Sequence, residues 1–416
     1  MKLNIQRIYS ILFALLLLCQ LYINSYKVTI VIQIIMLILI VVTENRIYLN
    51  LLKNTIPIII LIFLPFVPAF FNYYKLEVIF KDFFMIIKPV IGISLGYYIS
   101  NKLKTEKNFI KIIIYTGFIS AIIHLVIVII TGGLITGNVS EIREYGKDNF
   151  LELFAIIFLF FYRKFFYDNL FAKKSNNFLF KLILFISCIL YLSRTMLIIA
   201  GILLLTLYGF TRFTQKAIKI LLLLLLLFSI LYIFLFNINI DRNEKGIMGF
   251  LYKMKMAPGE IFVSKIDRQD HKKLWDHWRG YEANRAIELM KDNPSSFIIG
   301  NGYGSQVNLK FKAPLTSDDK GLKYISEIHN GYVFIFYKFG IVGLILILSF
   351  LKRLYVHVYK NNHFNSLMIS SIGLCYFFTT LTITGIYNKR DVIIFILGGF
   401  LSFSFQESKK GMRYEK

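Results

Sequence analysis

The sequence predicts an all-α integral membrane protein of about 12 transmembrane helices. Hydrophobic residues make up 56% of the 416 residues, phenylalanine alone occurs 41 times, and the mean hydropathy is +0.62. One water-soluble core could not bury so much apolar surface, so lipid must be the solvent for most of it. The apolar residues also form runs of about 17 to 23 residues, the length that crosses a bilayer as a helix.

These apolar runs give the order of the predicted helices. The first follows Lys2 and Arg7, as in a signal peptide, but no small-residue cleavage site comes after it, so we expect it to be retained. The chain divides into helices 1–9 in residues 1–238, a large hydrophilic loop in residues 239–330, and helices 10–12 with a tail in residues 331–416. The predicted helices lie near residues 8–24, 28–43, 56–71, 78–99, 109–132, 149–166, 177–192, 195–210, 217–238, 331–351, 364–386 and 391–406.

The basic residues predict the orientation of these helices. If the N-terminus is cytoplasmic, nearly all lysines and arginines of the short connections fall on the cytoplasmic side, as the positive-inside rule requires. Both termini are then cytoplasmic, and the large loop between helices 9 and 10 is extracytoplasmic. The inner connections carry Arg46, Lys53, Lys102, Lys104, Lys107, Arg163, Lys164, Lys173, Lys174, Arg212, Lys216, Lys352, Arg353, Lys360, Lys409, Lys410 and Arg413.

The formal charge of +24 does not indicate a nucleic-acid partner. The basic residues form short clusters between apolar runs and are not gathered on one soluble module, so we expect a lipid bilayer around the chain and no nucleic acid. The three cysteines, Cys19, Cys188 and Cys375, lie in separate apolar runs and predict neither a disulfide framework nor a thiolate metal site. We therefore expect no metal and no cofactor.

The large loop contains two recognisable patterns. Residues Tyr281–Met290 are good helix formers with an apolar stripe, and Asn293 with Pro294 predicts the end of that helix. The glycine-rich segment Ile298–Ser305 is expected to be a flexible turn. Its glycines do not have the spacing or the setting between a strand and a helix that a dinucleotide-binding fingerprint requires.

Charged groups that the topology does not require are candidates for function, because a charge near the bilayer centre costs about 2.5 to 3.5 kcal/mol. Lys88 either lines a polar cavity inside the helix bundle or snorkels or pairs with Asp82. Arg194 stands at the outer turn of a helical hairpin, where it either binds a ligand or caps the carbonyl groups that end the preceding helix. Arg143, in another outer loop between two glutamates, either binds a ligand or forms a solvated ion pair.

Three further candidates lie in the large loop. Arg279 and Arg285 both have acidic residues at helical spacing, so surface ion pairs are the alternative to ligand binding, and Arg279, beside Trp278, is the better candidate. His329 ends the loop directly before the tenth helix, where an outer cavity would meet the membrane. A neutral imidazole can accept a proton from an attacking hydroxyl, so His329 is the candidate general base, with a structural role as the alternative.

The segment His329–Leu344 reads His-Asn-Gly-Tyr-Val-Phe-Ile-Phe-Tyr-Lys-Phe-Gly-Ile-Val-Gly-Leu. It resembles the O-antigen ligase and Wzy-type O-antigen polymerase superfamily, whose signature is His-Asn, an aromatic-rich helix start and then Gly-Ile-x-Gly-Leu. Upstream, Arg279, the Asn293-Pro294 pair and the alternating glycines that begin at Gly300 resemble the long-loop pattern of that family. The layout of about twelve spans with the long loop after the ninth is similar too.

The resemblance implies a metal-independent glycosyltransferase that acts on an undecaprenyl-diphosphate-linked glycan at the outer face of the bacterial cytoplasmic membrane. By position, His329 would activate the acceptor hydroxyl, and Arg194 and Arg279 would hold the lipid diphosphate. Lys88 and Arg143 match more loosely. Partners that the resemblance implies are a chain-length regulator and a flippase of the same pathway.

Three functions remain open at this stage. A polymerase that joins lipid-linked repeat units is favoured over a ligase that transfers the finished glycan to lipid A core, because the Ile, Lys, Asn and Phe bias is typical of AT-rich surface-polysaccharide gene clusters. A secondary transporter also fits the spans and the buried cations. It would predict inverted repeats and paired interrupted helices, which the sequence does not show, and it has little use for so long an outer loop.

Overall fold

The computed structural model describes residues 5–133, 139–147, 150–166, 168–171, 174–191, 193–262, 271–314, 321–360 and 363–414. Every apolar run predicted from the sequence overlaps a helix in it. The helices of the bundle are α1 (Ile5–Tyr22), α2 (Tyr26–Glu44), α3 (Leu49–Phe63), α4 (Phe66–Phe71), α5 (Leu76–Leu103), α6 (Glu106–Ile130), α9 (Leu151–Phe166), α10 (Lys174–Leu190), α11 (Arg194–Leu207), α12 (Gln215–Asn237), α18 (Gly331–Tyr355), α20 (Phe364–Thr382) and α21 (Ile393–Tyr414).

Length and composition support the membrane assignment. In the described part of the chain, seven helices are long and apolar enough to cross a bilayer, and two more apolar helices, 177–190 and 194–207, are shorter. Helix α12 illustrates the point, since none of its most apolar window is buried inside the protein and its leucines face outward. Such a surface requires lipid, or another apolar partner, as its solvent. The total of twelve spans remains a prediction.

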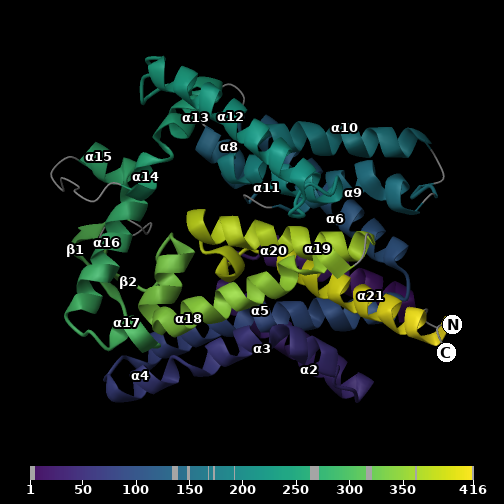
Figure 1. Ribbon diagram of the computed structural model, residues 1–416, viewed down its shortest axis with the longest axis horizontal. Helices are drawn as coiled ribbons and strands as arrows, with labels where there is room; N and C mark the ends of the chain where they lie inside the picture. Colours follow the sequence, from purple (N-terminus) through teal and green to yellow (C-terminus); the bar gives the residue numbers. More distant parts are fainter. Residues whose placement is uncertain are drawn as a thin grey trace.

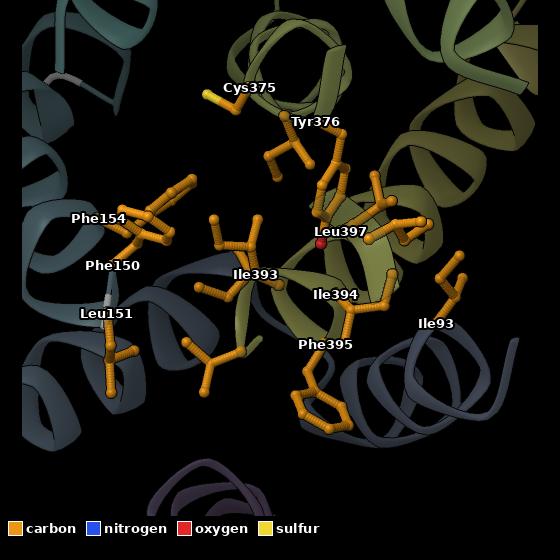
Figure 2. Packing of buried hydrophobic residues seen from close by; sticks show 14 of the residues in the cluster. Ile93, Phe150, Leu151, Phe154, Cys375, Tyr376, Ile393, Ile394, Phe395 and Leu397 are labelled. Carbon is orange, nitrogen blue, oxygen red and sulfur yellow. The ribbon is translucent and has the colours of Figure 1, made fainter. Parts of the chain in front are cut away.

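Helices α5 and α21 pack so closely that their backbones touch. A Cβ atom on Gly96 would lie 2.1 Å from the carbonyl oxygen of Phe395, and one on Gly398 would lie 2.2 Å from the carbonyl oxygen of Ile93. Small residues that let helix backbones meet are the usual means of association in lipid, where apolar side chains gain little from mutual burial. Figure 2 shows the isoleucine, phenylalanine and leucine side chains at the start of α21 directed toward α5, α9 and α20.

The glycine-rich segment is part of the bundle. Short helix α17 (Ser296–Ile299) and the turn after it fill a bend in α18, where Gly340 has φ 65° and ψ −162° and interrupts the helix. The backbone N–H of Asn301 donates to the carbonyl of Tyr337 (2.9 Å), and that of Gly302 donates to the carbonyl of Lys338 (3.0 Å). The turn thus binds carbonyl groups that the interruption leaves without a helical partner.

A buried ion pair holds the same turn from the other side. The Asp82 carboxylate of α5 accepts hydrogen bonds from the Lys338 ammonium (2.6 Å) and from the backbone N–H of Gly304 (2.9 Å), and both charged side chains are buried. Lys338 also donates to the carbonyl of Ser305, and the Tyr303 hydroxyl donates to α3. The expectation of a flexible turn is therefore wrong: the turn fixes the large loop to the membrane helices.

The rest of the large loop forms a small subdomain. In Figure 1 its elements α14 to α17 and the hairpin lie at the end of the molecule opposite the two termini. Helix α16 (Trp278–Lys291) contains the predicted loop helix, and it ends just before Pro294 as expected. The antiparallel hairpin of β1 (Val307–Ala313) and β2 (Leu322–Ile325) is a departure from the predicted all-α fold. The remaining short helices are α8 (Val139–Tyr145), α13 (Gly246–Met256), α14 (Gly259–Phe262), α15 (His271–Asp276), α19 (His357–Lys360) and the 3-10 turn η1 (Gly385–Tyr387).

The orientation in the membrane is a prediction that cysteine labelling tests. In a variant whose three native cysteines are replaced by serine, we expect Lys323→Cys to react with a membrane-impermeant maleimide in intact spheroplasts. Ser408→Cys, near the C-terminus, should react only after the membrane is permeabilised, because the basic connections favour cytoplasmic termini. Labelling of Ser408→Cys in intact spheroplasts would contradict the orientation.

Candidate functional site

Arg279 lies in the first turn of α16 and is directed to a carboxylate from another element. Its guanidinium donates to Oε2 of Glu260 in α14 at 2.8 Å. The acidic neighbours at helical spacing have other partners, since Asp276 pairs with Arg242 (3.0 Å) and Glu282 binds His329. The surface ion pairs considered for Arg279 from the sequence are thus replaced by a contact with a separate element.

Arg194 binds the same carboxylate. Helix α11 begins at Arg194, with the Ser193 hydroxyl as its N-cap, and this turn directs the arginine toward the loop subdomain. Its guanidinium donates to both oxygens of Glu260 at 3.0 and 3.3 Å and to the carbonyl of Lys253 at 2.6 Å. Glu260 is therefore held between two guanidinium groups, in the fork geometry by which arginine recognises carboxylates and phosphates.

Two more cations lie within electrostatic range of this pair. Burial lowers the pKa of Lys253, and the positive charges of Arg143 and Arg194 lower it further. Burial likewise lowers the pKa of Arg279, with Arg194 and Arg143 contributing in the same direction and Glu260 opposing them. Three of the predicted arginines thus lie within electrostatic range of one another and of Lys253, and two of them bind Glu260. A cluster with such an excess of positive charge is suited to an anion carrying more charge than one carboxylate.

His329 lies beside this cluster at the entrance to α18. Asn330 caps that helix by accepting hydrogen bonds from the backbone N–H groups of Tyr332 (3.1 Å) and Val333 (3.2 Å), and this fixes the preceding residue. The Glu282 carboxylate, which is buried on α16, accepts hydrogen bonds from the backbone N–H of His329 (2.9 Å) and from its ring Nδ1 (2.9 and 3.0 Å).

The Glu282 carboxylate determines how the imidazole can act. A carboxylate only accepts hydrogen bonds, so Nδ1 carries a proton and Nε2 of the neutral ring is left as the acceptor. The side chain of His329 is 54% exposed, which leaves that nitrogen accessible. The hydrogen bond to Glu282 raises the pKa of His329, while partial desolvation of the ring and the Arg279 charge oppose the increase. The same carboxylate–histidine arrangement orients the general base in many hydrolases.

This arrangement predicts a pH effect for Glu282→Gln. The base is neutral only above the raised pKa of His329, so transfer activity should increase as the pH passes through that value. Removing the carboxylate lowers the pKa and loosens the ring, so the acid limb of the kcat/KM profile should move to lower pH while the plateau falls by at least about tenfold. An unchanged acid limb at normal protein level would show that Glu282 does not act through His329.

Two of the predicted diphosphate-binding residues, Arg285 and Lys88, make hydrogen bonds outside the arginine cluster. Arg285 is buried on another face of α16, where it donates to the carbonyl of Asn308 in β1 (3.0 Å) and pairs with Glu288. The structure therefore gives Arg285 a role in joining α16 to the hairpin, and of the two loop arginines Arg279 is the one that meets Arg194.

Lys88 is fully buried in α5 and belongs to a different polar group. Its ammonium donates to the carbonyls of Asn388 (2.9 Å) and Lys389 (2.5 Å), in the irregular segment between α20 and α21. The suggested pairing with Asp82 is wrong, because Asp82 pairs with Lys338, and Lys88 does not snorkel. An isolated lysine in the sequence could not reveal which carbonyls a break in a distant helix would leave for it.

The acidic members of the site were not predicted from the sequence. Glu260 follows a proline and a glycine in a segment without clear periodicity, so nothing singled it out. Glu282 did carry a signal, since it shares one face of α16 with the buried Ala286 and Met290 at spacings of four. A carboxylate on the buried face of a helix needs a partner, and a histidine elsewhere in the loop was available.

The fold and these charges define a helical membrane protein with an ionic site between its large loop and its bundle. Residues 179–348 match the family described as O-Antigen ligase. This match supports the resemblance of the chain to the O-antigen ligase and polymerase superfamily. The segment includes Arg194, Arg279 and His329, whereas Lys88 and Arg143 precede it. None of the curated proteins and none of the solved structures compared with the chain matches it.

Proposed function

We propose that this protein is a membrane glycosyltransferase that polymerises undecaprenyl-diphosphate-linked oligosaccharide repeat units into a surface polysaccharide. The observation that carries the proposal is the carboxylate of Glu260 held between Arg194 and Arg279, with His329 beside them. An anion already occupies the position between the two guanidinium groups, at the end of the bundle that bears the large loop. A diphosphate carries more negative charge and would displace the Glu260 side chain.

The proposed reaction assigns each group one task. The hydroxyl oxygen of the acceptor glycan forms a bond to the anomeric carbon of the donor, and the bond from that carbon to the diphosphate oxygen breaks. The hydroxyl proton passes to Nε2 of His329, whose Nδ1–H remains on Glu282. The leaving diphosphate takes the electron pair, and the guanidinium groups stabilise the charge that develops on it. A diphosphate is a good leaving group, so charge stabilisation is needed more than an acid.

The ligase reaction is the second candidate, because the matching family is described as O-Antigen ligase. The two reactions share the lipid diphosphate donor, the leaving group and the need for one general base. They differ in the acceptor, which is another lipid-linked glycan for a polymerase and the lipid A core for a ligase.

Products distinguish the two reactions. Deleting the gene of a polymerase should leave single-repeat glycans on the cell surface, whereas deleting that of a ligase should leave long chains on undecaprenyl diphosphate. Purified protein should also elongate the lipid-linked glycan in the presence of EDTA, because the proposed reaction uses arginine in place of a divalent ion. Activity that ceased in EDTA and returned with magnesium would contradict the metal-independent mechanism, and the absence of any elongation would contradict the polymerase.

A further inference from the structure

A cavity lies at the same end of the bundle as the proposed active site. Its volume is about 910 Å³, and its walls come from the beginnings of α2 and α5, from the hairpin region and from the segment after α20. The charged residues of its lining are mostly basic. Four lysines, Lys27, Lys75, Lys81 and Lys389, face a single glutamate, Glu77. The proposed mechanism uses none of these residues.

Three of the lysines have no anionic partner in the part of the chain that the structure describes. Among the described residues, the ammonium groups of Lys27, Lys75 and Lys81 make no hydrogen bond or ion pair. Only Lys389 does, by pairing with Glu327 at 2.8 Å. Like charges directed into one cavity repel each other at a cost that an anionic ligand would remove. The first turns of α2 and α5 add their partial positive charge at the same place.

The other wall of the cavity is apolar and opens toward the membrane. Ile30 and Val31 of α2 and Phe80 and Phe84 of α5 line it, and Val31 and Phe80 are about half exposed, at 49% and 57%. A ligand that fits both walls has a charged head for the lysines and a hydrocarbon chain for the apolar helices. That combination describes a lipid with a phosphorylated headgroup and excludes a free sugar or a soluble anion as the best-fitting occupant.

The cavity is lined in part by the chain segment that leads to His329, the proposed general base. Ser326 and Lys389 line the cavity, Glu327 pairs with Lys389, and His329 follows two residues later in the same strand-to-helix connection. Lys88 supports this wall, since its ammonium holds the carbonyl groups of Asn388 and Lys389. The segment that carries His329 therefore also forms part of the cavity wall.

We propose that this cavity binds the diphosphate of a second lipid-linked glycan, the acceptor, while the Arg143, Arg194 and Arg279 cluster binds the diphosphate of the donor. This inference rests on the proposed function and goes further, because it gives the two substrates separate binding sites. It also distinguishes the polymerase from a ligase, whose acceptor does not carry a lipid diphosphate.

Native mass spectrometry of the purified full-length protein with undecaprenyl diphosphate tests the proposal. We expect two bound molecules per chain. The triple variant Lys27→Ala, Lys75→Ala, Lys81→Ala should bind one, with affinity at the lost site reduced about a hundredfold, since each lysine near an anionic headgroup contributes about a factor of five. Arg279→Ala should also bind one. A triple variant at Lys291, Lys312 and Lys323, exposed lysines that do not line the cavity, removes the same charge and should still bind two.

Each outcome separates the two proposals. One bound molecule in the wild type that is lost only in Arg279→Ala would refute the acceptor site and leave the donor site standing. A single bound molecule that is lost only in the triple variant of Lys27, Lys75 and Lys81 would support binding in the cavity and refute the role of the arginines. Binding of phosphatidylglycerol to the lysine-dependent site as tightly as undecaprenyl diphosphate would overturn the acceptor assignment, because the cavity would then be an ordinary phospholipid site.

Discussion

His329→Ala should abolish glycan transfer while the protein remains in the membrane at its normal level. The rate per folded molecule should fall by about 10² to 10⁴, the usual effect of removing a general base. Its Nε2 is left free because Nδ1 binds Glu282, which fixes the tautomer of the ring. The measurement is transfer from a lipid-linked glycan by purified protein, normalised to folded protein by thermal unfolding.

The structure supplies a control for this variant. His363 is exposed at the start of α20, at the other side of the bundle, and His363→Ala should retain wild-type turnover. A purely structural histidine at position 329 would give a different result. Its alanine variant would unfold at lower temperature, because the buried Glu282 would lose its partner, but the folded fraction would turn over nearly normally. Normal turnover of folded His329→Ala would remove the proposed chemistry.

Periodicity and apolar length were sufficient to predict the helices. Runs such as residues 217–238 are so uniformly apolar that only a lipid-exposed helix fits, and α12 occupies that run. The glycine-rich turn was misinterpreted because its role depends on a bend in α18, about 40 residues later, that only Gly340 marks in the sequence. Its backbone hydrogen bonds carry no side-chain signal, so flexible and anchored glycines look alike. The hairpin was missed because its strands are short, although β1 alternates apolar and polar residues, which is a strand signal.

The site was predictable where an individual residue was conspicuous for its position. Arg194 and Arg143 stood out because cations on the outer side oppose the positive-inside bias, and His329 stood out because it precedes a helix at the membrane surface. The partners of these residues depend on how the large loop folds back on the bundle. No local sequence pattern marks Glu260. Arg279 binds Glu260 and Arg285 binds the hairpin because the hairpin covers only one face of α16.

Arg194→Lys and Arg279→Lys should each lose most transfer activity, by about 10² to 10³, while still inserting in the membrane. Both arginines donate to Glu260, and Arg194 does so with two nitrogens, which is the geometry expected for a diphosphate that takes the place of the carboxylate. Lysine keeps the charge but offers one compact ammonium in place of a planar fork. The loss should therefore appear in kcat as well as in KM, because the charge on the leaving group is greatest in the transition state.

Arg242 is the matched control for these substitutions. It lies in the same large loop, is exposed to a similar extent and pairs with a carboxylate, Asp276, at 3.0 Å, but no second arginine among the described residues shares that carboxylate. Arg242→Lys should therefore retain near wild-type turnover. If Arg194→Lys and Arg279→Lys also retained it, their contacts with Glu260 would serve only to hold α14 against the bundle. The same two variants would then show a lower unfolding temperature and an unchanged affinity for undecaprenyl diphosphate.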